Sequence, residues 1–169
     1  MKSGTVVYPG TFDPITLGHL NVVERVSAIF EQVIVGVGVN PGKRHWFTPE
    51  ERVDQIRKST VHLNNIDVRI YEGLTVRFVQ QCKSRIMVRG VRPITDIPAE
   101  ITMMMANRQL APDVETLFLV ADGELAHVSS SLIKEIATVS DDTVLRAFLP
   151  EPIVEDVRRQ IDAGNKRTF

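Results

Sequence analysis

The sequence predicts a doubly wound α/β fold: a five-stranded parallel sheet with helices on both faces, followed by C-terminal helices. Short runs rich in β-branched residues alternate with amphipathic helical patterns, which is typical of parallel sheets. The run 33–39 is apolar or glycine throughout, as in a parallel strand buried on both faces. A glycine-bearing loop, 8–19, joins the first short strand to the first helical pattern.

Length and composition indicate a single domain spanning residues 1–169, with a sizeable core. The net charge of −1 argues against a nucleic-acid-binding protein, since these are usually basic. No segment is long and apolar enough to cross a membrane and no signal-peptide pattern is present, so we expect a cytoplasmic protein. Cys82 is the single cysteine, which excludes an intrachain disulfide and a cysteine-based zinc site.

The five strands are predicted at 5–7, 33–39, 66–71, 85–89 and 116–120. Ligands of parallel sheets bind beyond the carboxyl ends of the strands. We therefore expect the loops that follow the strands to converge on one site. These loops are 8–19, 40–43, 73–75, 89–92 and 122–131.

Helices are predicted between the strands. The first has one apolar face, formed by Val22, Val23, Val26, Ile29 and Phe30. The second begins after Thr48, because Thr48-Pro49-Glu50-Glu51 is a capping box with proline at the first helical position. The others are predicted at 75–83, 98–110, 130–139 and 152–163, the last stopping at Gly164.

The loop Tyr-Pro-Gly-Thr-Phe-Asp-Pro-Ile-Thr-Leu-Gly-His, 8–19, has the composition of a phosphate-handling loop. Gly10 and Gly18 let backbone N–H groups approach an anion, and the following helix N-terminus adds unsatisfied donors. His19 adds a side-chain donor for charge that develops in a transition state. The loop is neither a Walker A loop nor a dinucleotide fingerprint.

Three other groups of residues carry a functional and a structural interpretation. Ser129-Ser130-Ser131 begins a helix, so one serine is its N-cap while the rest offer donors to a triphosphate. Arg89 and Arg92 suit bidentate phosphate recognition, or pair with Asp96 or Glu100. Lys43 is a loop lysine that contacts phosphate or is simply solvated, with Arg44 and His45 beside it facing solvent.

These motifs together resemble one family. Thr16-x-Gly18-His19 resembles the (T/H)xGH motif of the nucleotidyltransferase superfamily, and Ser129–Ser131 with Lys134 resembles its second signature. The run Pro-Gly-Thr-Phe-Asp-Pro, 9–14, narrows the resemblance to the phosphopantetheine adenylyltransferase family. The resemblance extends from Tyr8 to about 149–151 and implies a Rossmann-like fold.

The resemblance implies transfer of AMP from ATP to 4′-phosphopantetheine, giving dephospho-CoA and pyrophosphate by direct in-line attack. It implies catalytic roles for His19 and Lys43, and contacts to phosphopantetheine from Thr11, Lys43, Thr75 and Arg89. No cluster in the sequence has metal-ligand spacing, so Mg²⁺ is expected to arrive with ATP. The ATP-binding residues implied are Thr11, Phe12, His19, Gly90, Val91, Arg92, Glu100, Leu125, Ala126, His127, Val128, Ser129, Ser130 and Ser131.

The run Met103-Met104-Met105 spans about 200° of a helix, so its side chains cannot all face one core. At least one is expected in the core, while the remainder contacts another subunit or an apolar ligand. The resemblance implies a homohexamer. It also makes feedback by CoA plausible, because CoA shares the pantetheine arm.

Two alternatives stay open. One is a related nucleotidyltransferase that acts on glycerol phosphate or nicotinamide mononucleotide. The other is a nucleotide sensor that has lost turnover. The sensor is kept open by departures from the family pattern: Ile97-Pro98 follows Asp96, and Leu125 and His127 replace aromatic residues.

Overall fold

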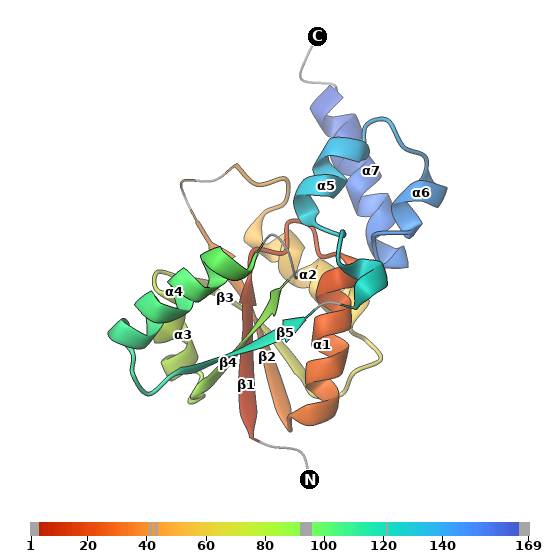
Figure 1. Cartoon of the computed structure of the whole chain (residues 1–169). Helices are drawn as coiled ribbons and strands as arrows, with labels where there is room; N and C mark the ends of the chain where they lie inside the picture. The colour runs from red at the N-terminus through yellow and green to blue at the C-terminus, as the bar shows by residue number, and fades with distance from the viewer. Residues whose placement is uncertain (1–3, 41, 43, 92–95, 121, 166–169) are drawn as a thin grey trace.

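The computed structural model describes residues 4–40, 42, 44–91, 96–120 and 122–165. Within these ranges the chain forms a five-stranded sheet in which every pairing is parallel (Figure 1). The strand order is β3-β2-β1-β4-β5. The strands are β1 (Thr5–Gly10), β2 (Gln32–Val39), β3 (Ile66–Glu72), β4 (Ile86–Val91) and β5 (Glu115–Val120).

In Figure 1, α1 lies on one side of the sheet and α3 and α4 on the other, while α5, α6 and α7 gather beyond the carboxyl ends of the strands. The predicted arrangement, with C-terminal helices, is therefore confirmed. The helices are α1 (Leu17–Ile29), α2 (Pro49–Ser59), α3 (Thr75–Gln81), α4 (Ile97–Leu110), α5 (Ser130–Ile136), α6 (Asp142–Arg146) and α7 (Glu151–Asn165), with a short 3₁₀ turn, η1 (Gly123–Leu125).

Two separate cores cover the two faces of the sheet. Val6 belongs to the larger core, with α1, α2 and the C-terminal helices. The next residue, Val7, belongs to the smaller core with α3, because successive strand side chains point to opposite faces. Both valines have no exposed surface. Burial on both faces explains why the runs of β1 and β2 lack a clean apolar–polar alternation.

Some predicted boundaries were wrong. Strand β1 continues through Tyr8 and Pro9 to Gly10, because these residues remain in register with β2. Strand β4 continues to Val91 because it pairs with β5, so 89–91 belong to a strand rather than a loop. The helix α5 ends at Ile136, α7 continues past Gly164, and α6 and η1 were not predicted.

The sheet opens between β1 and β4, where the chain changes its direction of winding. Beyond the pair Val7–Met87, the structure gives no further registered pair between these strands. Pro9 has no N–H to donate, and its carbonyl accepts a hydrogen bond from the Arg89 side chain at 2.8 Å. Such a reversal point is where doubly wound sheets bind ligands.

Candidate functional site

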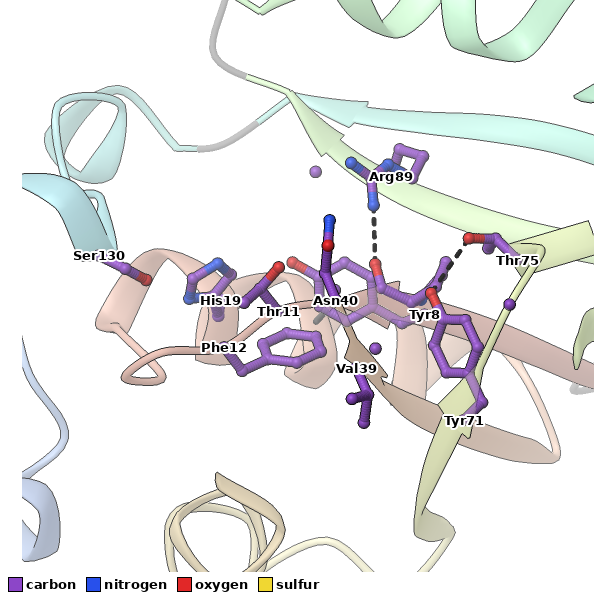
Figure 2. A pocket seen from close by; sticks show the side chains of 15 residues that line it. Tyr8, Thr11, Phe12, His19, Val39, Asn40, Tyr71, Thr75, Arg89 and Ser130 are labelled. Atoms are coloured by element: carbon purple, nitrogen blue, oxygen red, sulfur yellow. Dashed lines mark hydrogen bonds between the residues drawn. The ribbon is translucent and has the colours of Figure 1, made fainter. Parts of the chain in front are cut away.

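A cavity of about 600 Å³ lies at this opening, and Figure 2 shows the side chains that line it. A second cavity of about 270 Å³ lies beside it towards α4 and α5. The two share Tyr8, His19, Arg89, Gly90 and Ser130, so they form one bipartite site. Two adjoining compartments suit a reaction that joins two substrates.

The residues predicted as ligand-binding divide between the two compartments. Of the described ones, Ala126, His127 and Ser131 line neither cavity, while Lys43 and Arg92 lie outside the described residues. Those lining the first are Thr11, Phe12, His19, Thr75, Arg89, Gly90 and Ser130. Those lining the second are His19, Arg89, Gly90, Val91, Glu100, Leu125, Val128, Ser129 and Ser130.

Phe12 forms the turn of the first loop. Its φ of 50° lies in the left-handed region, which is unusual for a residue with a side chain. Its ring is buried and packs edge-on against Tyr8 and His19, with centroid distances of 5.3 and 5.1 Å. A Cβ at Gly10 would lie 2.7 Å from the Phe12 ring, so the glycine is needed for this packing.

His19 is the third residue of α1 and takes part in a capping box with Thr16. The His19 N–H donates to Thr16 Oγ1 at 3.3 Å, and the Thr16 N–H donates to His19 Nδ1 at 3.1 Å. Since Nδ1 accepts this hydrogen bond, a neutral ring carries its proton on Nε2. The box therefore fixes both the ring position and the nitrogen that can donate.

Arg89 connects three elements at the boundary of the two cavities. Its Nε and Nη2 donate to the Glu100 carboxylate at 2.8 and 2.5 Å, and its Nη1 donates to Pro9. The structural interpretation of Arg89, pairing with Glu100, is confirmed. Burial lowers the pKa of Arg89, but the Glu100 carboxylate outweighs this and holds the pKa above its ordinary value. Burial also raises the pKa of the nearby Tyr8 phenol.

Asp13, a residue of the first loop, is the centre of a second network. Its side chain is 2% exposed and accepts hydrogen bonds from the N–H groups of Trp46 and Phe47 at 2.9 to 3.1 Å. It also pairs with Lys134 of α5 and lies 3.5 Å from His45 Nδ1. Burial raises the pKa of Asp13, but Lys134 and the two backbone donors outweigh this and hold it below its ordinary value. His45 therefore faces this network, and its predicted exposure to solvent was wrong.

Arg52 of α2 lies beneath the same loop and has no exposed surface. Its Nη1 donates to the carbonyls of Thr11, at 2.8 Å, and Gly38, at 3.2 Å. Burial lowers its pKa, which the negative charges of Asp13 and Glu50 oppose. Sequence reasoning missed Arg52, because it looks like an ordinary polar position in a helix.

The three serines have different environments. Ser129 is the N-cap of α5 and accepts from the Leu132 N–H at 3.1 Å, as predicted for one of the three. Ser130 donates to the Pro14 carbonyl at 2.8 Å and lines both cavities. Ser131 is exposed, and His127 packs edge-on against Phe148.

The far end of the first cavity contains residues that sequence reasoning did not select. Tyr71 stacks on Phe78 and its hydroxyl lies 3.1 Å from Thr75 Oγ1 (Figure 2). Asn40 also lines the cavity. Asn40 directly follows β2, and Tyr71 lies near the end of β3, so strand topology was the signal that could have indicated them.

The described part of the chain contains no group of three or more His, Cys, Asp and Glu side chains placed to hold a metal ion. Glu100, which lines the second cavity beside Asp96, is paired with Arg89, and Asp13, which lines neither cavity, is paired with Lys134. In the same ranges, no helix has the length and apolar character needed to span a membrane.

Comparison with known proteins agrees with this geometry. Residues 7–136 match the model of the cytidylyltransferase-like family, so the chain is a nucleotidyltransferase. A structure of the Plasmodium falciparum nicotinic acid mononucleotide adenylyltransferase complexed with NaAD shares the fold. Its TM-score is 0.67 at 13% identity, with 95% of this chain and 96% of that chain covered.

Curated relatives identify the group more narrowly. The phosphopantetheine adenylyltransferase of Rhodopirellula baltica is 50% identical over 164 residues, covering 96% of this chain and 92% of the relative. The phosphopantetheine adenylyltransferase of Finegoldia magna is 44% identical over 162 residues, covering 96% of this chain and 99% of the relative. The chain belongs to the phosphopantetheine adenylyltransferase family, as the resemblance of its motifs predicted.

Proposed function

We propose that this enzyme transfers the adenylyl group of ATP to 4′-phosphopantetheine, forming dephospho-CoA and pyrophosphate. The observation that carries the proposal is the bipartite cavity at the reversal point of the sheet, with His19 and Arg89 at its boundary. The family membership and the names of the relatives support the choice of substrates.

In the proposed reaction a phosphate oxygen of phosphopantetheine attacks the α-phosphorus of ATP in line. The new P–O bond forms as the bond to the β-phosphate oxygen breaks, and pyrophosphate leaves with that electron pair. No covalent enzyme intermediate is needed, since phosphoryl-group transfer of this kind depends on positioning and charge stabilisation. His19 Nε2–H donates to the developing charge on the α-phosphate, and Lys43 neutralises the acceptor phosphate.

The first cavity takes the acceptor, next to Thr11, Thr75 and Arg89. The second takes the nucleoside of ATP, next to Gly90, Leu125 and Ser129, and the ATP phosphates extend from there past His19 to Thr11 and Phe12 in the first cavity. Thr11 is exposed at the mouth of the first cavity, where it can contact both substrates. Glu100 binds Arg89 through both carboxylate oxygens. Glu100 also lines the second cavity, where it borders the nucleotide.

Mg²⁺ is proposed to enter with ATP. The carboxylates of Asp13 and Glu100 are already paired with cations, so neither fits the role of a resident magnesium ligand. ATP phosphates and water provide the oxygen ligands that Mg²⁺ prefers. The ion would neutralise phosphate charge, and none of the steps assigned to the chain's own residues depends on it.

We also propose a homo-oligomer, a hexamer by the resemblance, that associates through α4. None of the residues of α4 is buried, so the prediction that at least one methionine of 103–105 packs in the core was wrong. Met103 and Met105 are 57% and 65% exposed, and Leu117 and Val120 of β5 are 43% and 51% exposed. An apolar helix without a core to cover is typical of a subunit interface.

A cytoplasmic location and competitive feedback by CoA complete the proposal. CoA would enter the first cavity with its pantetheine arm, so raising the concentration of phosphopantetheine should relieve inhibition. Inhibition that neither substrate relieves would contradict this mode of feedback.

The test is to follow products by mass spectrometry with ATP or CTP and three acceptors: 4′-phosphopantetheine, nicotinamide mononucleotide and glycerol phosphate. Formation of dephospho-CoA and pyrophosphate from ATP and phosphopantetheine alone is expected. Transfer to another acceptor would favour a related nucleotidyltransferase. Bound ATP with no product from any pair would favour a sensor.

A further inference from the structure

Arg52 is a buried cation that reaches the site from behind. It has no exposed surface and lines neither cavity, yet its Nη1 bonds the carbonyls of two residues that do line the first cavity, Thr11 and Gly38. Its Nε also donates to the Thr48 carbonyl at 3.3 Å, and its buried Nη2 has no partner among the described residues. A buried charge held in this way costs free energy, so a simple packing role does not account for it.

The contact with Thr11 sets the direction of the next backbone donor. The carbonyl of Thr11 and the N–H of Phe12 belong to one trans peptide, in which the two groups point in opposite directions. Because the carbonyl is turned towards Arg52, away from the cavity, the Phe12 N–H is turned towards the cavity. The left-handed φ of Phe12 is consistent with a peptide that is held in an unfavourable orientation.

The contact with Gly38 likewise turns a backbone carbonyl towards Arg52, here near the end of β2. Both carbonyls are partially negative, and an anion in the cavity would be repelled by them. Arg52 draws both oxygens to the rear, and it links the first loop to β2 across the floor of the cavity. A single side chain therefore removes two acceptors from the anion side and fixes the spacing of two loops.

We propose that Arg52 is a positioning residue for adenylyl transfer, which holds the Thr11–Phe12 peptide so that the Phe12 N–H faces the phosphates of ATP. The proposal rests on the proposed function for its kinetic effect but not for its effect on binding. Lysine cannot reproduce this role, since it lacks the planar guanidinium fork that serves Thr48, Thr11 and Gly38 together.

The test compares Arg52→Lys with the wild type in equilibrium binding of ATP and of adenosine, and in kcat. ATP binding should weaken about tenfold and kcat should fall about 10- to 100-fold, since small misplacements of reacting groups are costly. Adenosine binding should change less than threefold, because adenosine has no phosphate. The stoichiometry of adenosine binding also gives the fraction of folded sites in each sample, so partial unfolding is not mistaken for weaker ATP binding.

Two variants of α2 serve as controls. Gln55→Met replaces a buried side chain, 1% exposed, whose amide has no partner among the described residues, and Arg57→Lys makes the same chemical change at an exposed position. Both should bind ATP and turn over as the wild type does. Wild-type ATP binding and kcat in Arg52→Lys would overturn the proposal, and so would equal losses of ATP and adenosine binding. A wild type that makes no dephospho-CoA would instead defeat the proposed function, and the comparison of ATP with adenosine would still test Arg52.

Discussion

Arg89 binds Glu100 of α4 with one edge of its guanidinium and the Pro9 carbonyl of β1 with another nitrogen. One side chain thus connects β4, α4 and β1 at the point where the sheet opens. Arg89 is proposed to contact phosphopantetheine, so the position of this cation depends on Glu100.

Glu100→Gln is expected to raise the KM for phosphopantetheine about tenfold, because the loss of one charge-assisted bond loosens Arg89. The KM for ATP should change less than threefold. Glu135→Gln, at an exposed carboxylate of α5, is the control. An increase in the KM for ATP alone would show that Glu100 serves adenosine rather than Arg89.

Asp13→Asn is expected to lower the free energy of unfolding by about 2 kcal/mol at neutral pH, since Asp13 is a buried, charged acceptor. The pKa of Asp13 is below its ordinary value of 3.8, so its stabilisation is complete above that value and is lost as the pH falls through the folded pKa. The free energies of unfolding of Asp13→Asn and the wild type, measured in urea, should therefore converge as the pH falls below about 4.

Asp54→Asn is the control for Asp13, because the Asp54–Lys58 pair lies at the surface. It should cost less than about 0.5 kcal/mol at neutral pH. If the difference in free energy of unfolding between Asp13→Asn and the wild type does not depend on pH, the charge of Asp13 does not stabilise the fold.

Gly10→Ala is expected to lower stability by about 1–3 kcal/mol, because the added Cβ overlaps the Phe12 ring. That ring packs against His19, so kcat should fall as well. Gly123→Ala is the matched control, since a Cβ there meets open space. Equal thermal unfolding midpoints for the two variants would contradict the packing argument.

Met105→Glu is expected to dissociate the oligomer, since it places a charge on the exposed apolar side of α4. Sedimentation velocity should show smaller species at the concentration where the wild type is associated. Val139→Glu changes a residue that is 86% exposed and lies outside α4, and it should leave assembly unchanged. A wild type that sediments as a monomer would remove the basis for this interface.

Sequence patterns predicted the sheet, its covering helices and about half of the residues that line the cavities, because buried parallel strands and capped helix starts have strong local signals. The capping box at Thr48 is an example that the structure confirms. Contacts between distant segments were not predictable in this way. Arg52 with Thr11 and Asp13 with Lys134 depend on how α2 and α5 pack, and that packing leaves no local pattern. The extensions of β1 and β4 likewise depend on pairing with neighbouring strands.

The most direct measurement is pyrophosphate release from MgATP with and without 4′-phosphopantetheine, for the wild type and His19→Ala. Release that requires the acceptor and falls about 100-fold or more in the variant, with both substrates still bound, is the predicted result. Undiminished release in His19→Ala, or no release from a wild type that binds ATP, would contradict the account.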